Sequence, residues 1–538
     1  MIKKTPKNLS PKQREVLKVI EDAVKNLKKT GMESYLGNKG YSIYKDSLNH
    51  EMIDYIKNEL TVQPQIHGSI VEAPYFPVYQ ESEKKLYVPR FWGITTFGPP
   101  KSIKLSKGDD IGLQFKGDMR DYQMRIVDAY MKAINAPDQG TSSALIELKC
   151  GGGKTVLALK IIEQVKKKTI IFVHKTFLKN QWIERIGQFL PGARIGSIQG
   201  QTLDIDDKDI VIAMVQSISM KAYPDSLFDS FGLSIYDEVH HLSSEVFSNC
   251  LKKCNTLCGL GLSATMERKD GLTHVFKMYL GEICFKSRDD EVKDDVLVKA
   301  IAYETTDSEY NEVERDYRGN VKYSTMISKI SNFGFRSDFI VDVLKTELRI
   351  NPEQQIILLA HNKSLLNYLF KAITFATVGY YIGGMKEAAL KQSETKVVIL
   401  ATYAMAAEAL DIKTLTTLLL ASPKSDIVQA VGRILRQKHR QPVIIDIIDT
   451  VEPFLNQFNK RRAFYNEKGY KIIRTTNDQY IEFIKELNKN TNTDMDIQEI
   501  KDIEMKYYQE MKMRKSKKKH GLDSTTLELE AKCLIDIG

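Results

Sequence analysis

The stretch Cys150-Gly151-Gly152-Gly153-Lys154-Thr155 decides the fold, because it stands between an apolar run at residues 143–148 and a helical pattern. Glycines adopt backbone angles that turn several N–H groups toward a phosphate, and the N-terminus of the next helix adds a partial positive charge. Such a loop predicts nucleotide binding, with Lys154 on the β- and γ-phosphates and Thr155 on Mg²⁺. An ordinary glycine loop is the alternative, since Leu148 replaces the first glycine of the general GxxxxGK[ST] pattern.

Two acids end a second apolar run, in the stretch Ile235-Tyr236-Asp237-Glu238-Val239-His240-His241. Behind a phosphate loop, an acid pair suits metal holding and water activation. Asp237 is expected to bind Mg²⁺, and Glu238 to polarise the water that attacks the γ-phosphate. An isolated Asp-Glu pair would more often be a surface pair at a strand end, so the upstream loop favours the catalytic interpretation.

A third element, residues 427–436, has the sequence IVQAVGRILR. Arg433 and Arg436 are three residues apart, which places them on one face of a helix. Two guanidinium groups can stabilise the charge that develops during phosphoryl transfer. Alone, this pattern would be a solvated basic helix; with the loop and the acid pair it predicts two arginine fingers.

These motifs, together with Ser263-Ala264-Thr265 and Gln429-x-x-Gly432-Arg433-x-x-Arg436, resemble the ordered motifs of superfamily 2 helicases over roughly residues 115–470. Residues 237–241 with Phe247, and residues 261–271, resemble the xeroderma-pigmentosum-B type of repair and transcription helicase. They also resemble the poxvirus-type transcript-release helicases of large DNA viruses. Met266 departs from the proline that commonly follows Ser-Ala-Thr.

The resemblance implies roles for further residues. Gln123 is expected to read adenine and so to favour ATP, although a polar residue at a helix N-terminus is the alternative. Gln429 joins the arginines at the catalytic site. Lys175 and Thr402 are expected to contact the phosphate backbone of the strand. Ser263, Thr265 and Asp411 are expected to couple hydrolysis to the grip on the strand. The nucleotide is expected to bind the loop residues Cys150, Gly151, Gly152, Gly153, Lys154 and Thr155.

Apolar runs of strand length alternate with helical patterns, which suits parallel sheets covered on both faces by helices. The runs are residues 143–148, 169–174, 209–215, 233–236, 258–262, 354–360, 396–401, 416–421 and 442–448. We therefore predict an α/β protein with two RecA-like doubly wound parallel-sheet lobes, ATP lying between them. The expected domains are a small α+β N-terminal module (1–112), lobe 1 (113–288), an inter-lobe connector (289–350), lobe 2 (351–475) and a charged helical and basic tail (476–538).

The N-terminal module shows a helical pattern at residues 12–29 and two aromatic-rich runs, 75–79 and 85–92, that read as strands. Tyr87, Phe91 or Trp92 could stack on bases, but an aromatic mini-core is the alternative that we favour. Cys250, Cys254 and Cys258 are four apart and follow a helical stripe, so small core residues are favoured over a zinc site.

Composition agrees with this interpretation. The 538 residues are 42% hydrophobic, enough for about three domains with cores. A net charge of +9 suits partial contact with phosphates, although many soluble proteins share it. Six scattered cysteines predict a reducing compartment. No signal peptide or membrane-spanning run is apparent, which predicts an intracellular protein of the host cytoplasm or viral factory, the nucleus or the virion.

The predicted function is that of an ATP-dependent nucleic-acid helicase or translocase using ATP and Mg²⁺. The resemblance implies DNA, 3′ to 5′ polarity, and a place in transcription termination or repair alongside transcription or repair proteins. An ATP-dependent RNA helicase is the alternative within the same class. A non-catalytic, ATP-gated clamp that recruits partners is the alternative from another class, and Glu238 argues against it because a clamp needs no water-activating carboxylate.

Overall fold

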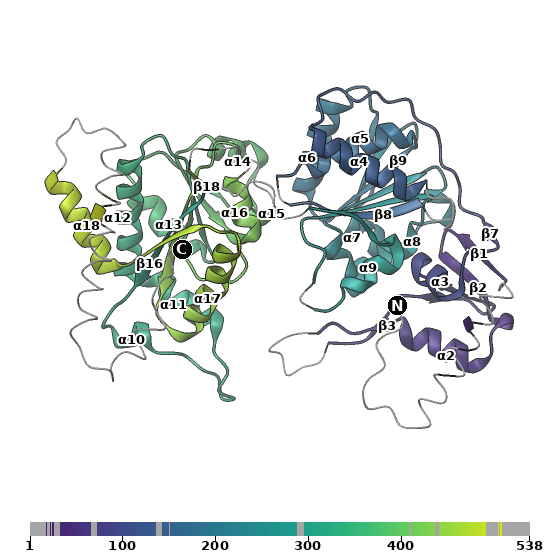
Figure 1. Cartoon of the computed structure of the whole chain (residues 1–538), viewed down its shortest axis with the longest axis horizontal. Helices are drawn as coiled ribbons and strands as arrows, with labels where there is room; N and C mark the ends of the chain where they lie inside the picture. Colours follow the sequence, from purple (N-terminus) through teal and green to yellow (C-terminus); the bar gives the residue numbers. More distant parts are fainter. Residues whose placement is uncertain are drawn as a thin grey trace. The chain divides into compact units, whose positions relative to one another are not determined.

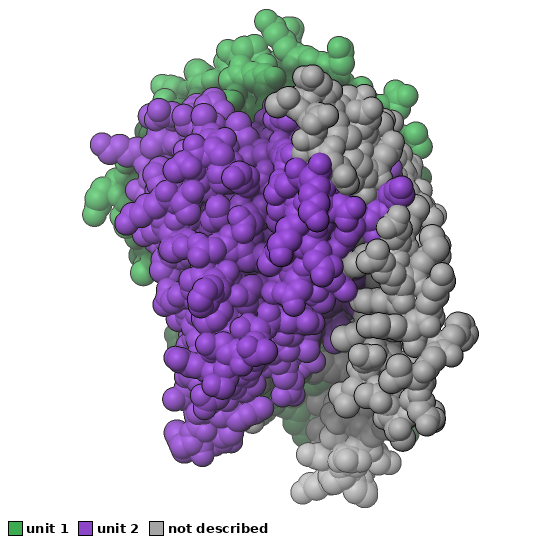
Figure 2. All heavy atoms as spheres, turned by 90° about the vertical axis from the view of Figure 1, so that its left-hand side faces the viewer, with its two compact units in different colours: residues 1–287 green, residues 288–538 purple. Residues whose placement is uncertain are grey.

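A computed structural model of the chain describes residues 33–65, 73–135, 142–149, 151–268, 270–287, 295–408, 412–435 and 441–490, with residues 18, 22, 24, 25, 439, 504, 506 and 507. The chain forms two compact units, residues 1–287 and 288–538, shown in two colours in Figure 2. Each unit is described by itself. Among the described residues, no helix combines the length and apolar character needed to cross a membrane.

The first unit is built on an eight-stranded sheet in the order β11-β10-β12-β9-β13-β14-β8-β15. All neighbouring strands are parallel except β10 and β11. The strands are β8 Ser142–Glu147, β9 Thr169–Val173, β10 Ile195–Gln199, β11 Thr202–Asp204, β12 Ile210–Met214, β13 Leu233–Asp237, β14 Cys258–Ser263 and β15 Ile283–Lys286. The five runs predicted from the sequence in this half are confirmed as β8, β9, β12, β13 and β14.

Helices cover both faces of this sheet (Figure 1). One face carries α4 Asp121–Ile134, α5 Lys154–Val165 and α6 Thr176–Phe189, whose apolar residues share a core with the strands. The other carries α7 Val215–Met220, α8 Glu245–Lys253 and α9 Thr273–Leu280. Consecutive apolar residues such as those of β12 are explained by this double cover.

Residues 34–103 form a small module with a five-stranded sheet in the order β5-β6-β2-β1-β7. Its elements are β1 Ser34–Gly37, β2 Gly40–Tyr44, α2 His50–Glu59, β3 Thr61–Val62, β4 Phe76–Pro77, β5 Gln80–Glu81, β6 Lys85–Val88, α3 Arg90–Phe97 and β7 Ser102–Ile103. The strand predicted at 85–92 is half wrong, because Pro89 ends β6 and a helix begins at Arg90. The pattern at 12–29 lies almost wholly outside the described residues.

The module is anchored to lobe 1 by the buried side chain of Arg90. Its guanidinium donates to the carbonyl oxygens of Thr256 and Leu257 and to Ser143 Oγ. The hydroxyl of Tyr279 on α9 donates to the carbonyl of Val78 at 2.5 Å. Trp92 is buried in the aromatic core, as the preferred alternative predicted. These polar contacts fix the module on the eight-stranded sheet without any ion pair to Arg90 among the described residues.

The second unit has a seven-stranded, fully parallel sheet in the order β18-β19-β17-β20-β21-β16-β22. Its strands are β16 Leu297–Tyr303, β17 Ile356–Ala360, β18 Val378–Tyr381, β19 Val398–Thr402, β20 Thr417–Leu420, β21 Val443–Asp449 and β22 Lys471–Thr476. The helices are α10 Ser308–Asn311, α11 Tyr323–Asn332, α12 Gly334–Ile350, α13 Lys363–Ala372, α14 Glu387–Glu394, α15 Tyr403–Glu408, α16 Val428–Ile434, α17 Glu452–Glu467 and α18 Asn477–Asn490. The four strand runs predicted in this half are confirmed, and so is the predicted fold class of two doubly wound lobes.

Two predicted boundaries of the second unit are wrong. The expected connector, 289–350, contains β16, which lies inside the sheet between β21 and β22, and α12, whose buried face joins the core. The expected tail from 476 begins with α18, whose Tyr480, Phe483 and Leu487 are fully buried. Charged residues within these elements, such as Lys299 in β16, obscured their apolar faces. The basic cluster at 512–520 lies outside the described residues.

Cys250, Cys254 and Cys258 are buried without disulfides, as the core interpretation predicted. Within the described part of the chain, no group of three or more His, Cys, Asp or Glu side chains is placed to hold a metal ion. The zinc alternative therefore finds no support in the geometry.

Candidate nucleotide site

The predicted phosphate loop joins the end of β8 to the start of α5. Gly151 and Gly153 have positive φ angles of 78° and 84°, a conformation that favours glycine. A Cβ atom on Gly152 would lie 2.6 Å from the buried Leu148 side chain. Leu148, which replaces the first glycine of the general pattern, thus packs directly under the loop. Cys150 lies outside the described residues.

Two residues of α4 hold the loop from the other side. The Tyr122 hydroxyl donates to the carbonyl of Gly152 at 3.1 Å. Gln123 Oε1 accepts from the backbone N–H of Arg120 at 3.0 Å, which caps the helix, and its amide nitrogen lies 3.5 Å from the Gly152 carbonyl. The helix N-terminal alternative for Gln123 is therefore confirmed; adenine reading by this residue stays a prediction.

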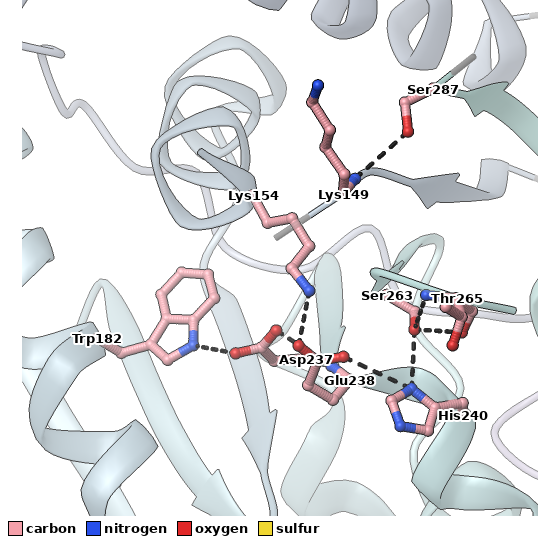
Figure 3. A network of polar contacts seen from close by, with 9 residues as sticks. All are labelled: Lys149, Lys154, Trp182, Asp237, Glu238, His240, Ser263, Thr265 and Ser287. Carbon is pink, nitrogen blue, oxygen red and sulfur yellow. Dashed lines mark hydrogen bonds and ion pairs between the residues drawn. The ribbon is translucent and has the colours of Figure 1, made fainter. Parts of the chain in front are cut away.

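The acid pair lies beside the loop lysine at the C-terminal end of β13 (Figure 3). Lys154 Nζ donates to Glu238 Oε1 at 2.6 Å. Trp182 Nε1 on α6 donates to Asp237 Oδ2 at 2.9 Å, while Asp237 Oδ1 accepts from the Glu238 backbone N–H at 3.1 Å. Glu238 has a φ of 49° in the left-handed region, a strained backbone of the kind found at functional sites.

The two carboxylates have opposite electrostatic environments. Burial and the adjacent Glu238 carboxylate raise the pKa of Asp237 to about 6. Burial acts on Glu238 in the same direction, but Lys154 and His240 outweigh it and lower the pKa of Glu238 to about 2. Glu238 is therefore ionised at neutral pH. The negative charge on Asp237 is less favourable, and a bound cation would stabilise it.

His240 links the acid pair to the Ser263-Ala264-Thr265 motif. Its Nδ1 lies 2.8 Å from Ser263 Oγ and 3.5 Å from Glu238 Oε2. Ser263 Oγ donates to the Thr265 carbonyl at 2.5 Å and accepts from its backbone N–H at 3.2 Å. The guanidinium of Arg268 contacts the His240 carbonyl and pairs with Asp270. The structure thus connects Glu238 to Ser263 and Thr265, two of the three residues predicted to couple hydrolysis to the strand grip.

Three histidine rings continue from this motif toward the end of β9. The centroids of His240 and His241 are 4.2 Å apart, and those of His241 and His174 are 4.3 Å apart. Burial and the neighbouring Lys175 lower the pKa of His174 to about 4, and burial with His240 lowers that of His241 to about 3. These two rings are neutral at neutral pH. Lys175, the predicted strand contact, follows His174 and is exposed.

The predicted site residues of the second unit are only partly placed. Arg433 on α16 is buried, and its Nε donates to the Ala406 carbonyl at 2.8 Å. Gln429 is half-buried on the same helix, and Thr402 is half-buried at the end of β19. Arg436 and Asp411 lie outside the described residues. Since α16 ends at Ile434, a common helical face for the two arginines stays a prediction.

Two residues that hold the site were missed as such from the sequence. Nothing in the sequence around Trp182 shows that its indole orients Asp237. His240 follows the acid pair in the sequence, but the sequence did not predict its contact with Ser263. Both contacts join residues far apart in the chain, so only the order of the motifs could have suggested them.

The residues present fit a magnesium nucleotide. A Cβ on Gly152 would meet Leu148, and one on Gly153 would lie 2.4 Å from Gln123, so the packing of this loop requires glycine at both positions. Lys154 supplies a cation at the helix N-terminus, and Asp237 supplies a half-buried carboxylate for the metal. Glu238 supplies an ionised base next to both. The arrangement can bind a triphosphate and activate a water against it.

Comparison with known proteins points the same way. A family model described as "Type III restriction enzyme, res subunit" matches residues 116–268. The chain is 32% identical over 451 residues to "Putative ATP-dependent RNA helicase L396" of Acanthamoeba polyphaga mimivirus, covering 80% of this chain and 85% of the relative. A relative from African swine fever virus, also named a "Putative ATP-dependent RNA helicase", is 25% identical over 394 residues, covering 66% and 74%.

Among solved structures, "S. cerevisiae Dbp5 bound to RNA and ADP BeF3" aligns with 69% of this chain and 97% of its own, at 13% identity and a TM-score of 0.46.

Proposed function

Because this chain belongs to the superfamily 2 helicases of large DNA viruses, which hydrolyse ATP, we propose that it couples this hydrolysis to movement along a single strand of nucleic acid. The observation that carries the proposal is the contact of Lys154 with Glu238, beside an Asp237 held by Trp182. Glu238 lies 2.6 Å from Lys154, the proposed phosphate-binding lysine. A carboxylate in this position can activate the attacking water, which hydrolysis requires and nucleotide binding alone does not.

In the proposed cycle, the γ-phosphate of MgATP draws Lys154 away from Glu238. The released carboxylate then accepts a hydrogen bond from the attacking water, while Asp237 holds Mg²⁺ together with Thr155. Arg433 and Arg436 are proposed to stabilise the charge on the transferred phosphoryl group. The loss of the γ-phosphate reverses the exchange and restores the Lys154–Glu238 contact.

The strand-binding side is proposed to receive this change through His240 and Ser263, which lie within hydrogen-bond distance of each other. Movement of Glu238 alters the position of His240, and Ser263 passes it to Thr265. Lys175 and Thr402 are proposed phosphate-backbone contacts, and Asp411 a link between them and the nucleotide. Grip through phosphates implies low sequence specificity and strong salt dependence.

The motif resemblance favours DNA as the strand, with 3′ to 5′ movement in transcript release or repair. The names of the mimivirus and swine fever virus relatives favour RNA, which makes an RNA helicase the second candidate. Phosphate contacts discriminate little between the two sugars, so the substrate must be measured.

ATPase rates measured without nucleic acid, and with single-stranded DNA, duplex DNA or single-stranded RNA, test the proposal. Wild type and Glu238→Gln are compared. DNA stimulation that is lost in the variant supports a DNA motor, and stimulation by RNA alone supports the second candidate. Absence of turnover under every condition, with nucleotide binding intact, would replace both with a non-catalytic clamp.

A further inference from the structure

The sheet of the N-terminal module has two chemically different faces. Alternate residues of its central strands, Leu36, Tyr41, Ile43, Leu86 and Val88, are buried, and most of them belong to the core shared with lobe 1. The intervening residues point the other way, because side chains alternate along a strand. That second face is partly open among the described residues, since its tyrosines are half-buried and Lys104 is exposed, whereas Ser42 between the tyrosines is buried.

The strand register places three tyrosines on this open face. Tyr35 lies opposite Ser42, and Ser42 lies opposite Tyr87, so these residues form one row across β1, β2 and β6. Tyr44 and Lys85 face each other in the next row. The rings of Tyr35 and Tyr44 are 6.3 Å apart at 55°, so they present separate, differently tilted faces.

Lysines stand over these rings. Lys85 Nζ lies 5.0 Å from the centroid of Tyr35 and 4.7 Å from that of Tyr44, and Lys104 Nζ lies 4.4 Å from Tyr35. Lys39 lies 5.6 Å from the Tyr87 ring. Within the described part of the chain, neither Lys85 nor Lys104 forms an ion pair with a carboxylate.

The acids near the face are already neutralised. Lys39 pairs with Asp225 at 3.1 Å. Glu33 lies two residues before Tyr35, on the same side of the strand, and pairs with Lys101 at 2.8 Å. Glu81 lies opposite Leu86, on the other face of the sheet, and pairs with Lys45 and Lys57. The face therefore combines aromatic rings with two cations that have no internal counter-ion.

We propose that this face, defined by Tyr35, Tyr44, Tyr87, Lys39, Lys85 and Lys104, is a second binding site for single-stranded nucleic acid, separate from the motor's strand grip. Unpaired bases would stack on the tyrosine rings, and the lysines that now lie over these rings would pair with the phosphates. Separate tilted rings can stack only on bases that do not stack on each other, so a duplex fits poorly. Uncompensated lysines favour a polyanion over a neutral or basic peptide.

This site deepens the proposed function by giving the motor a place to hold the strand independently of ATP. It does not depend on hydrolysis, so it can be tested in the absence of nucleotide. A failure of ATP turnover and a failure of this site are thereby distinguishable.

Fluorescence anisotropy on the full chain, without nucleotide, measures binding of labelled oligo-dT and oligo-U of about 16 nucleotides. The double variant Tyr35→Ala/Tyr87→Ala should weaken binding at least about tenfold, whereas Tyr35→Phe/Tyr87→Phe, which keeps the rings, should stay within about twofold. Lys85→Glu/Lys104→Glu should also weaken binding, and its affinity should decrease less steeply with salt concentration than that of wild type. Lys132→Glu, an exposed lysine on α4, is the single-charge control.

Each variant is checked by its melting temperature and by its ATPase rate without nucleic acid, both of which should match wild type. Ultraviolet cross-linking of iodinated oligonucleotides to the wild-type protein should yield adducts on peptides with Tyr35, Tyr44 or Tyr87, whether or not the variants fold. Unchanged binding in the alanine variant, equal losses in the alanine and phenylalanine variants, or adducts confined to other segments would overturn the proposal. So would equal competition by duplex, because it would indicate a phosphate surface rather than a stacking platform.

Discussion

The two large sheets of this protein share one architecture but use charge in different ways. In the first unit, Lys154, Asp237 and Glu238 meet at the ends of strands, and the last of them has a strained backbone. In the second unit, the strongest charge contacts lie inside the fold. Arg336 and Asp449 are fully buried and bonded at 2.5 and 2.9 Å.

The other buried charges of the second unit follow the same rule. Arg461 makes two bonds of 2.8 Å to Asp446. Lys299 is held between Glu347 and Glu504, at 2.9 and 2.5 Å. Charges that are paired with one another in the interior fix a fold, whereas charges at a strand edge that can exchange partners support chemistry. We therefore expect substitutions in the first group to change turnover and those in the second to change stability.

The largest effect is expected from Glu238→Gln. The amide cannot accept the proton of the attacking water, so the stimulated ATPase rate should fall by about 10²- to 10⁴-fold. Steady-state ATPase assays measure this rate. The melting temperature should fall only modestly, because the substitution keeps the shape of the side chain although it removes the charge that pairs with Lys154. A loss of activity that tracks a loss of folded protein would break the contrast between the two units.

The next effect is on stability, in the second unit. Asp449→Leu leaves the buried guanidinium of Arg336 without its carboxylate and should lower the free energy of unfolding by about 3–5 kcal/mol. The double variant Arg336→Met/Asp449→Leu should recover most of that loss. Urea unfolding measures both.

An exposed pair provides the control for this experiment. Lys391 and Glu387 lie 3.7 Å apart on the surface of α14, and Lys391→Met should change stability by no more than about 1 kcal/mol. Equal losses for Asp449→Leu and Lys391→Met would show that burial does not separate the two kinds of charge. The ATPase rate per folded molecule should be unchanged in all these variants.

The same contrast explains what could be predicted from the sequence. The nine strand runs were found because both faces of each parallel sheet are covered, so their residues are apolar in succession. The glycine loop and the acid pair were singled out because nucleotide chemistry needs particular residue types in order, and their roles stay predictions. Both signals are local in the chain.

The missed features depend on partners far away in the sequence. β16 carries Lys299 in its middle, and nothing nearby in the chain shows that Glu347 and Glu504 neutralise this lysine in the interior. The contact of Trp182 with Asp237 spans 55 residues. The buried position of Arg433 was likewise not predictable from its spacing to Arg436. Long-range neutralisation and orientation are properties of the packed structure.

The pH dependence of MgATP binding gives a smaller, more specific test of the first unit. Burial raises the pKa of Asp237 from 3.8 to about 6, so the residue gains a proton as the pH falls through 6 and then attracts Mg²⁺ less. MgATP affinity should weaken by up to about tenfold per pH unit below this value, while ATP without Mg²⁺ changes less. For the free protein the sign is opposite, because ionised Asp237 costs stability above pH 6 and this cost is relieved on acidification.

Trp182→Phe sharpens this test. The indole N–H bond favours the ionised carboxylate, so its removal should move the inflection in MgATP affinity to higher pH. Isothermal titration calorimetry across pH 5–8 measures the shift. An inflection that stays in place would show that Trp182 does not tune Asp237, and a shift to lower pH would reverse the assigned cause.

The smallest expected effect concerns His241, whose ring lies between those of His174 and His240. Since its pKa is lowered by burial, the ring is neutral and acts through packing rather than charge. His241→Phe should therefore keep nucleic-acid stimulation of the ATPase within about twofold, whereas His241→Ala should reduce it severalfold, about 1 kcal/mol of lost ring contact. If phenylalanine were as harmful as alanine, the imidazole nitrogens would be needed, and the histidine stack would belong with the exchangeable charges of the site rather than with its packing.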